Sequence, residues 1–209
     1  MRKIFLALPL FIAVPLVAQS APQMPGTMDT SRVTAGNYTV DPSHTLVGWR
    51  VSHFGFNDYF GIFGDATGTL TLDPKKPNAS KVEITIPVSK VTTASTGLTG
   101  HLLRAGKDGG KPDFFGPAPA DAKFVSKAVT VNGTRALVTG DLTLNGITKP
   151  VRLDAQFSGA GTNPFNKKET VGFHATSVIK RSNFGINYGI PMVTDEVKLD
   201  ISVAFEKAS

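Results

Sequence analysis

The chain has 209 residues, a formal net charge of +6 and no cysteine. The absence of cysteine excludes disulfide bonds, thiolate metal sites and cysteine nucleophiles. The basic residues are scattered along the chain, whereas a nucleic-acid partner requires a basic stripe with interleaved aromatic residues. We therefore expect no nucleic-acid partner.

The first twenty residues have the layout of a secretory signal peptide. Arg2 and Lys3 precede an apolar run over residues 4–17, and small residues follow at Ala18 and Ser20. The run is about 14 residues long, which is short for a membrane span of roughly 20 residues. We expect cleavage after Ser20 and export to the periplasm, and the lack of cysteine excludes a lipoprotein anchor.

The remaining chain is predicted to hold one domain behind a short leader. Residues 21–36 contain Pro, Gly and polar residues without periodicity, so we predict a flexible leader. Residues 37–207 are predicted to form the domain, and a mature chain of about 189 residues is ample for a single hydrophobic core.

Period-two alternation dominates the domain and predicts strands with one apolar face. Val47, Trp49, Val51 and His53 fall on one face, for example, with Arg50 on the other. We expect about eight strands, of which the first two form one bent strand. The predicted ranges are 38–41, 45–54, 62–73, 81–90, 123–131, 135–144, 150–159, 170–181 and 195–206.

The connections support an antiparallel sheet. Asn132-Gly133 and Asn145-Gly146 lie between alternating runs, where both residue types tolerate the positive φ of a tight hairpin turn. No strand–helix alternation is present, and only residues 97–104 are predicted to form a short helix. An antiparallel sheet of about eight strands closes into a barrel that is either filled or hollow, and a sandwich is the alternative architecture.

The sequence offers little chemistry for catalysis. None of the common nucleophile, metalloprotease, phosphate-loop or dinucleotide motifs is present. His44, His53, His101 and His174 show no metal-ligand spacing, although convergence in space would still permit a zinc site. We expect no catalytic residue and no metal.

Two polar residues continue apolar faces and are therefore candidates for ligand contact. His53 extends the face of Trp49, and is either a satisfied core residue or a polar contact in a pocket. Arg181 is in register with the apolar face of its strand, so its charge needs either a carboxylate of the protein or the polar head of a ligand. The Gly-spaced aromatic residues from Phe54 to Phe63 follow the strand of His53, and we expect them to line a barrel end.

An ordered set of motifs resembles the YceI-like family of periplasmic, lipocalin-like polyisoprenoid-binding proteins. The resemblance spans residues 38–205. Its pieces are Tyr38-Thr39-Val40-Asp41-Pro42-Ser43-His44, Val51-Ser52-His53-Phe54-Gly55, Gly61-Ile62-Phe63, His101-Leu102-Leu103, Asp113-Phe114-Phe115, Gly140-Asp141-Leu142-Thr143-Leu144-Asn145-Gly146-Ile147-Thr148-Lys149-Pro150 and Arg181-Ser182-Asn183-Phe184-Gly185-Ile186.

The resemblance implies an all-β fold, an antiparallel eight-stranded lipocalin-like barrel with one short helix and a long apolar cavity. It implies an isoprenoid ligand, such as a polyprenyl phosphate or a quinone tail, and no other cofactor. Residues 104–112 are an insertion relative to the usual family pattern, and their Lys107 and Lys111 are candidates for a phosphate contact. Candidates for polar contacts are His53, His101 and Arg181, and candidates for the cavity wall are Trp49, Phe54, Phe63, Phe114, Phe184 and Ile186.

The predicted function is that of a periplasmic carrier or scavenger of an isoprenoid or other long-chain lipid. Transient membrane contact and a monomer or homodimer are compatible with this function. One alternative is an enzyme that acts on a lipid or quinone in the cavity, for which His53 is the acid–base candidate. The other is a ligand-free structural or interaction module with a filled barrel.

Overall fold

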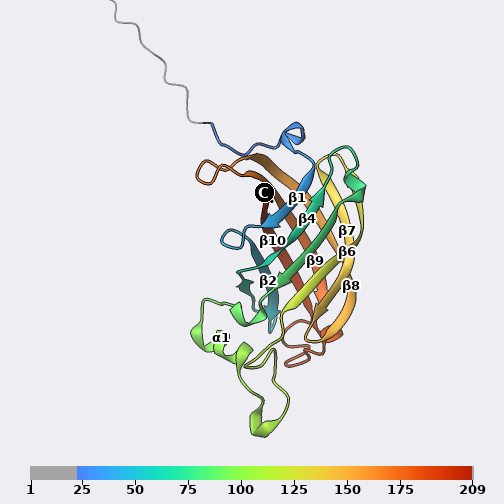
Figure 1. Cartoon of the computed structure of the whole chain (residues 1–209). Coiled ribbons are helices and arrows are strands. Elements are labelled where there is room, and N and C mark those ends of the chain that lie inside the picture. Colours follow the sequence, from blue (N-terminus) through green and yellow to red (C-terminus); the bar gives the residue numbers. More distant parts are fainter. Residues whose placement is uncertain (1–22, 209) are drawn as a thin grey trace, which may run out of the picture.

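A computed structural model describes residues 23–208, which contain ten strands joined in one antiparallel sheet. The predicted signal peptide lies outside the described residues. Figure 1 shows the strands wrapped around a common axis. The strands are β1 (Gly36–Val40), β2 (Leu46–His53), β3 (Asn57–Phe63), β4 (Thr67–Leu72), β5 (Lys81–Ile86), β6 (Ala122–Asn132), β7 (Arg135–Leu144), β8 (Ile147–Thr162), β9 (Glu169–Lys180) and β10 (Glu196–Lys207).

The ten strands build an eight-stranded barrel, because two pairs of strands each act as one. β1 and β2 pair with successive parts of β10, where Tyr38 faces Lys207 and Leu46 faces Ser202. β4 and β3 pair in turn with β1 and β2. Pairing of β1 with both β4 and β10 closes the ring. The predicted barrel and its bent first strand are confirmed, and closure rules out the sandwich.

Some predicted strand boundaries were wrong. The strand predicted over residues 81–90 ends at Ile86, and a 3₁₀ turn covers Val88–Lys90. We predicted a strand over residues 62–73 and a non-strand segment before it, but β3 begins at Asn57 and a break separates it from β4. Tyr59 and Phe63 face inward, whereas Phe60 and Ile62 face outward and are 54% and 41% exposed. Large apolar side chains on both faces conceal the period of two that identifies a half-buried strand.

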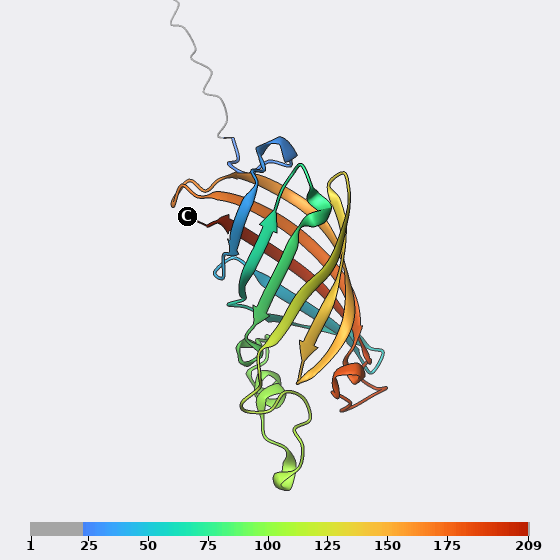
Figure 2. The ribbon, with the colours of Figure 1, turned by 45° about the vertical axis from the view of Figure 1, so that its right-hand side comes forward.

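The predicted short helix is confirmed as α1 (Thr96–Leu103). Short 3₁₀ turns make up the other helical elements: η1 (Thr30–Arg32), η2 (Pro77–Ala79), η3 (Val88–Lys90), η4 (Lys107–Gly109) and η5 (Arg181–Phe184). Figures 1 and 2 show α1, the loop after it and the chain after η5 at the lower end of the barrel. The N-terminal segment lies at the upper end. No helix within residues 23–208 is long and apolar enough to cross a membrane.

The described part of the segment that we predicted as a leader contacts the barrel. Thr27 and Ala160 of β8 exchange two backbone hydrogen bonds of 2.8 and 3.1 Å. The approach depends on Gly161, because a Cβ atom there would lie 2.0 Å from the carbonyl oxygen of Pro25. We call residues 25–33 the N-terminal strap. Val33 of the strap packs against the core cluster around Tyr38.

Candidate ligand cavity

The barrel is hollow and encloses a cavity of about 1180 Å³. Its wall consists of the inward side chains of β2 to β10, most of them apolar. It reaches from α1 and the chain after η5, where Leu98 and Tyr188 line it, to the β6–β7 turn, where Gly133 and Arg135 line it. These elements lie at the lower and upper ends in Figure 1, so the cavity runs the length of the barrel. Its volume is above the usual range for small-molecule sites, which is about 300–1,000 Å³.

A belt of small side chains explains why the barrel is not filled. Ala136, Ala155 and Ala175 are register partners on β7, β8 and β9, and all three line the cavity. An eight-stranded barrel is wide enough for side chains to fill or for one small ligand to occupy. Because three neighbouring alanines fill little of the interior, room for a ligand remains.

Arg181 lies at the lower end of the cavity and is only 5% exposed. Its Nε, Nη1 and Nη2 atoms donate to the backbone carbonyls of Thr194, Ile186 and Val193 at 2.9, 3.1 and 2.8 Å. The protein therefore satisfies this side chain with backbone carbonyls, where the sequence analysis considered a carboxylate of the protein or the head of a ligand. Within residues 23–208 no carboxylate forms an ion pair with it, so its charge is held at the cavity end by neutral groups.

Burial of the guanidinium lowers the pKa of Arg181, and the nearby Asp195 carboxylate opposes this shift. Both effects leave a cation at neutral pH, since an arginine remains charged at any ordinary pKa. The carboxylate of Asp195 is itself bonded to the backbone N–H and the hydroxyl of Ser182, at 2.8 and 2.7 Å.

His101 belongs to a cluster that joins α1, the following loop and the chain after η5. Its Nε2 atom lies 2.8 Å from Oδ2 of Asp113, which also accepts a bond from Arg104 at 2.7 Å. The hydrogen bond from Arg104, and to a smaller extent that from His101, lowers the pKa of the Asp113 carboxyl. The His101 ring makes edge contacts with Phe114 and Tyr188, with centroids 5.2 and 5.3 Å away.

The imidazole of His53 lines the cavity rim and stacks edge-on against Phe54, with ring centroids 4.4 Å apart. Within the described part of the chain, its nitrogens make no hydrogen bond to protein. No group of three His, Asp or Glu side chains within residues 23–208 is arranged as a metal site.

A model of the YceI-like domain matches residues 38–205. The chain belongs to the YceI-like family.

Relatives in the YceI-like family cover most of the chain. It is 39% identical over 172 residues to the protein YceI of Escherichia coli O6:H1, an alignment that covers 81% of this chain and 86% of the relative. It is 37% identical over 177 residues to the YceI of Salmonella arizonae, covering 83% and 88%.

Solved structures agree on the fold. The YceI protein of Campylobacter jejuni is 28% identical with a TM-score of 0.61, over 76% of this chain and 90% of that one. BcnA of Burkholderia cenocepacia is 24% identical with a TM-score of 0.63, over 79% and 98%. A polyisoprenoid binding domain from Saccharophagus degradans is 13% identical with a TM-score of 0.53, over 82% and 98%. The last two comparisons show the fold alone.

Eight of the nine residues that we proposed from the sequence line the cavity of this YceI-like barrel. The ninth, Phe184, is 1% exposed and packs with Phe124, Val138 and Leu142 in a core cluster. Lys107 and Lys111 do not line the cavity. The eight lining residues are Trp49, His53, Phe54, Phe63, His101, Phe114, Arg181 and Ile186.

Several lining residues of the YceI-like barrel were missed. Tyr59 lies on the same face of β3 as Phe63, so it could have been predicted as a lining residue if β3 had been recognised as a strand. Tyr188 and Arg135 approach the cavity only through the tertiary fold, for which the sequence carries no local signal. Two lining donors, Nε1 of Trp49 and the hydroxyl of Tyr59, are buried without a hydrogen-bond partner in the described structure.

Proposed function

We propose that this YceI-like protein binds the long apolar tail of a lipid inside its barrel and acts as a periplasmic carrier or scavenger. We propose an isoprenoid tail of the polyprenyl phosphate or quinone type. The observation that carries the proposal is the continuous, mainly apolar cavity of about 1180 Å³. Export is supported by the signal-peptide pattern of residues 1–20.

Tail burial supplies the affinity in this proposal. Each CH₂ group transferred from water to an apolar wall contributes roughly 0.8 kcal/mol. Ten such groups contribute roughly 8 kcal/mol before the cost of ordering the tail is subtracted. A ligand with a long flexible tail therefore suits the cavity better than a compact polar molecule.

The charge pattern favours a particular class of head group. Arg181, His53 and His101 are at the lower end, and no aspartate or glutamate within residues 23–208 lines the cavity. An acceptor-rich head, either a phosphate or a quinone carbonyl, complements donors and a buried cation. A cationic head would be repelled by Arg181.

Binding without turnover accounts best for the cavity. In many acid–base sites a hydrogen-bonded partner orients the side chain that transfers the proton. His53 has no such partner within residues 23–208, and the only carboxylate bonded to His101 is held by Arg104 as well. The polyisoprenoid binding domain of Saccharophagus degradans shares the fold, which supports an isoprenoid ligand by analogy of fold only.

Native mass spectrometry of protein purified from its own host tests the proposal. We expect a mass above that of the chain, with a lipid that can be extracted and identified. A homogeneous mass at the chain value would favour the ligand-free module and would overturn the proposal. If His53→Ala retained the ligand but abolished a turnover seen with the wild type, the enzyme alternative would replace the carrier.

A further inference from the structure

Five large apolar side chains are exposed around the lower end of the cavity, and we call them the rim patch. Phe54 and Phe56 lie at the β2–β3 turn, Leu98 is on α1, and Tyr188 and Met192 lie in the chain after η5. Phe56 is the most exposed at 89%, and the other four are between 41% and 55% exposed. Scattered single residues of this kind are ordinary, but a group around one opening marks an interaction site.

Contacts between the segments show that the rim patch is one surface. The backbone N–H of Phe54 donates to the carbonyl of Met192 at 2.6 Å. The ring of Tyr188 packs against His101 of α1, one helical turn from Leu98. The turn, the helix and the loop therefore surround the same opening.

The rim patch is continuous with the cavity. Phe54, Leu98, Tyr188 and Met192 are exposed and also line the cavity wall. Phe54 has a φ of 55°, a left-handed conformation that a bulky residue adopts at an energetic cost. Such strain is tolerated where it serves a function. Here it holds an aromatic ring between the cavity and the outside.

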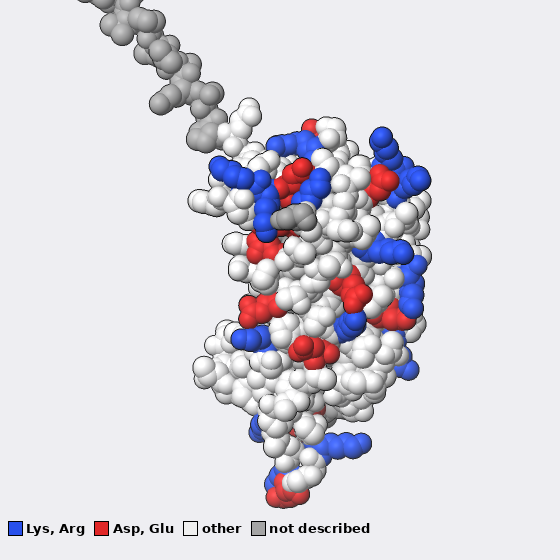
Figure 3. All heavy atoms as spheres, in the orientation of Figure 1, with Lys and Arg blue, Asp and Glu red and all other residues white. Residues whose placement is uncertain are grey.

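Charged side chains of both signs flank the rim patch. The loop between α1 and β6 lies at the same end of the barrel (Figure 1) and carries Arg104, Lys107 and Lys111 together with Asp108, Asp113 and Asp121, of which Asp113 pairs with Arg104. Lys107 and Lys111 form no ion pair within the described residues. Figure 3 shows a largely uncharged surface around this end, with a few charges of both signs on the projecting loop, whereas charges of both signs are denser toward the upper end.

We propose that the rim patch docks on the surface of a bilayer that contains anionic lipids, with the lower cavity opening against the acyl layer. This inference rests on the proposed function, because a water-insoluble tail needs a route between membrane and cavity that avoids water. Aromatic and apolar side chains partition into the membrane interface, and lysines add attraction to anionic head groups. A bilayer matches both features of this surface.

Flotation with vesicles of phosphatidylethanolamine and phosphatidylglycerol tests the apolar part of the surface. Phe56→Ser removes the most exposed ring of the rim patch, and Phe165→Ser removes a 93% exposed ring in the β8–β9 turn at the opposite end. We expect Phe56→Ser to weaken vesicle partitioning about tenfold and Phe165→Ser to leave it unchanged. Equal effects of the two substitutions would overturn the proposal.

The charged part is tested with the double substitution Lys107→Gln and Lys111→Gln. We expect roughly tenfold weaker binding to the anionic vesicles, a smaller salt dependence, and no change on vesicles of phosphatidylcholine alone. No vesicle binding by the wild type would overturn the proposal, as would a dimer that Phe56→Ser dissociates in analytical ultracentrifugation.

Failure of docking and failure of lipid binding can be distinguished. Trp49 is the only tryptophan in the sequence and lines the cavity, so its fluorescence reports occupancy independently of the rim patch. We expect Phe56→Ser to retain the wild-type response of Trp49 to added lipid in detergent. A protein that binds no vesicle but retains this response would overturn docking and leave the carrier function intact.

Discussion

Arg181 shows how a single side chain organises the lower end of the barrel. Its guanidinium ties together three backbone carbonyls of the chain between η5 and β10. That chain supplies Ile186, Tyr188 and Met192 to the cavity wall. Arg181 thus acts as a structural anchor as well as a cation beside the ligand.

We predict that Arg181→Met lowers the free energy of unfolding by about 3–5 kcal/mol, because buried carbonyls lose their donors. Arg181→Lys should recover only part of the loss, since an ammonium cannot reproduce the planar fork. Urea unfolding measures the free energy of unfolding of both variants. Arg152→Met on the exposed face of β8 serves as the control and should stay within about 0.5 kcal/mol. An equal loss in the control would contradict the anchor role.

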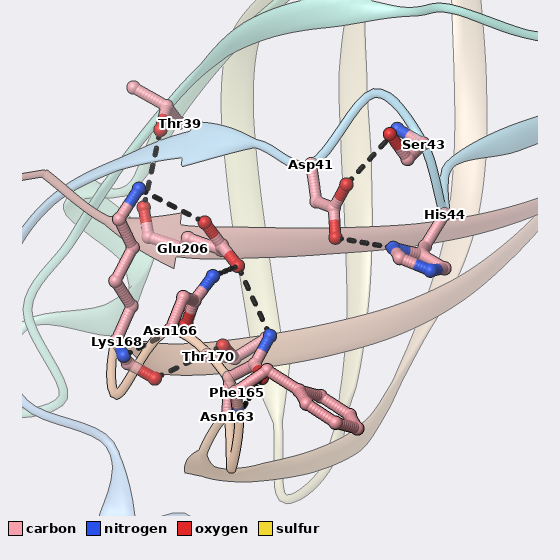
Figure 4. A network of polar contacts seen from close by, with 10 residues as sticks. All are labelled: Thr39, Asp41, Ser43, His44, Asn163, Phe165, Asn166, Lys168, Thr170 and Glu206. Carbon is pink, nitrogen blue, oxygen red and sulfur yellow. Dashed lines mark hydrogen bonds and ion pairs between the residues drawn. The ribbon is translucent and has the colours of Figure 1, made fainter.

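Glu206 holds the β8–β9 turn at the opposite end of the barrel, and Figure 4 shows its polar contacts. Its carboxylate accepts bonds from Asn163 and Asn166 of the β8–β9 turn and pairs with Lys168 at 3.1 Å. The hydrogen bond from Asn166, followed by Lys168, lowers the pKa of Glu206 although burial and Asp41 oppose the shift. The charged form is therefore the one that stabilises the fold.

A lowered pKa means that Glu206 contributes stability above the unfolded-state pKa of about 4.3 and loses it as pH falls through the lower folded-state value. We expect Glu206→Gln to cost roughly 1–2 kcal/mol at pH 7, with the difference from wild type shrinking below about pH 4.3. Urea unfolding across pH measures this, with exposed Glu196→Gln as the control. A difference that is constant from pH 7 to pH 3 would refute the assignment.

The elements of this protein differ in how well the sequence predicts them. Alternation placed the apolar face of β2 correctly, because Val47, Trp49, Val51 and His53 all line the cavity and a buried face on one side is a local property of the strand. The turn at Asn145 and Gly146 was equally local, and both residues have the positive φ values that a tight hairpin requires, 52° and 75°. β3 was missed because its outward face is apolar as well.

The N-terminal strap was not predictable, because its composition is that of a loop. It is held by backbone bonds to β8 and by the space that Gly161 leaves. The same limit applies to the cavity: alternation identifies the inward residues, but only the barrel register places Ala136, Ala155 and Ala175 side by side. Eight of the nine residues proposed for the ligand site nevertheless line the cavity. The ninth, Phe184 in η5, packs in a core cluster.

We predict that Gly161→Ala detaches the strap, because the new Cβ atom would collide with the backbone at Pro25. Hydrogen exchange at the amides of Thr27 and Ala160 should accelerate, and stability should fall by about 1–3 kcal/mol. Gly100→Ala in α1 meets no atom within 4 Å and is the matched control. Unchanged protection of Thr27 in Gly161→Ala would show that the strap does not depend on this contact.

At the scale of the whole molecule, the function depends on an interior that the protein itself does not fill. Ala155→Phe would place a ring in the alanine belt and displace part of the bound tail. Loss of two buried CH₂ groups corresponds to roughly tenfold weaker retention. Native mass spectrometry should show this loss, whereas Thr139→Phe on the exposed face of β7 should retain wild-type loading. Full loading of Ala155→Phe would place the ligand elsewhere.

The most direct test of the central claim is a crystal structure of the protein purified from its own host. The account predicts continuous elongated electron density along the barrel axis, from the rings of Phe114 and Tyr188 toward Arg135. A barrel whose own side chains close that space along its length, with no continuous density, would contradict it.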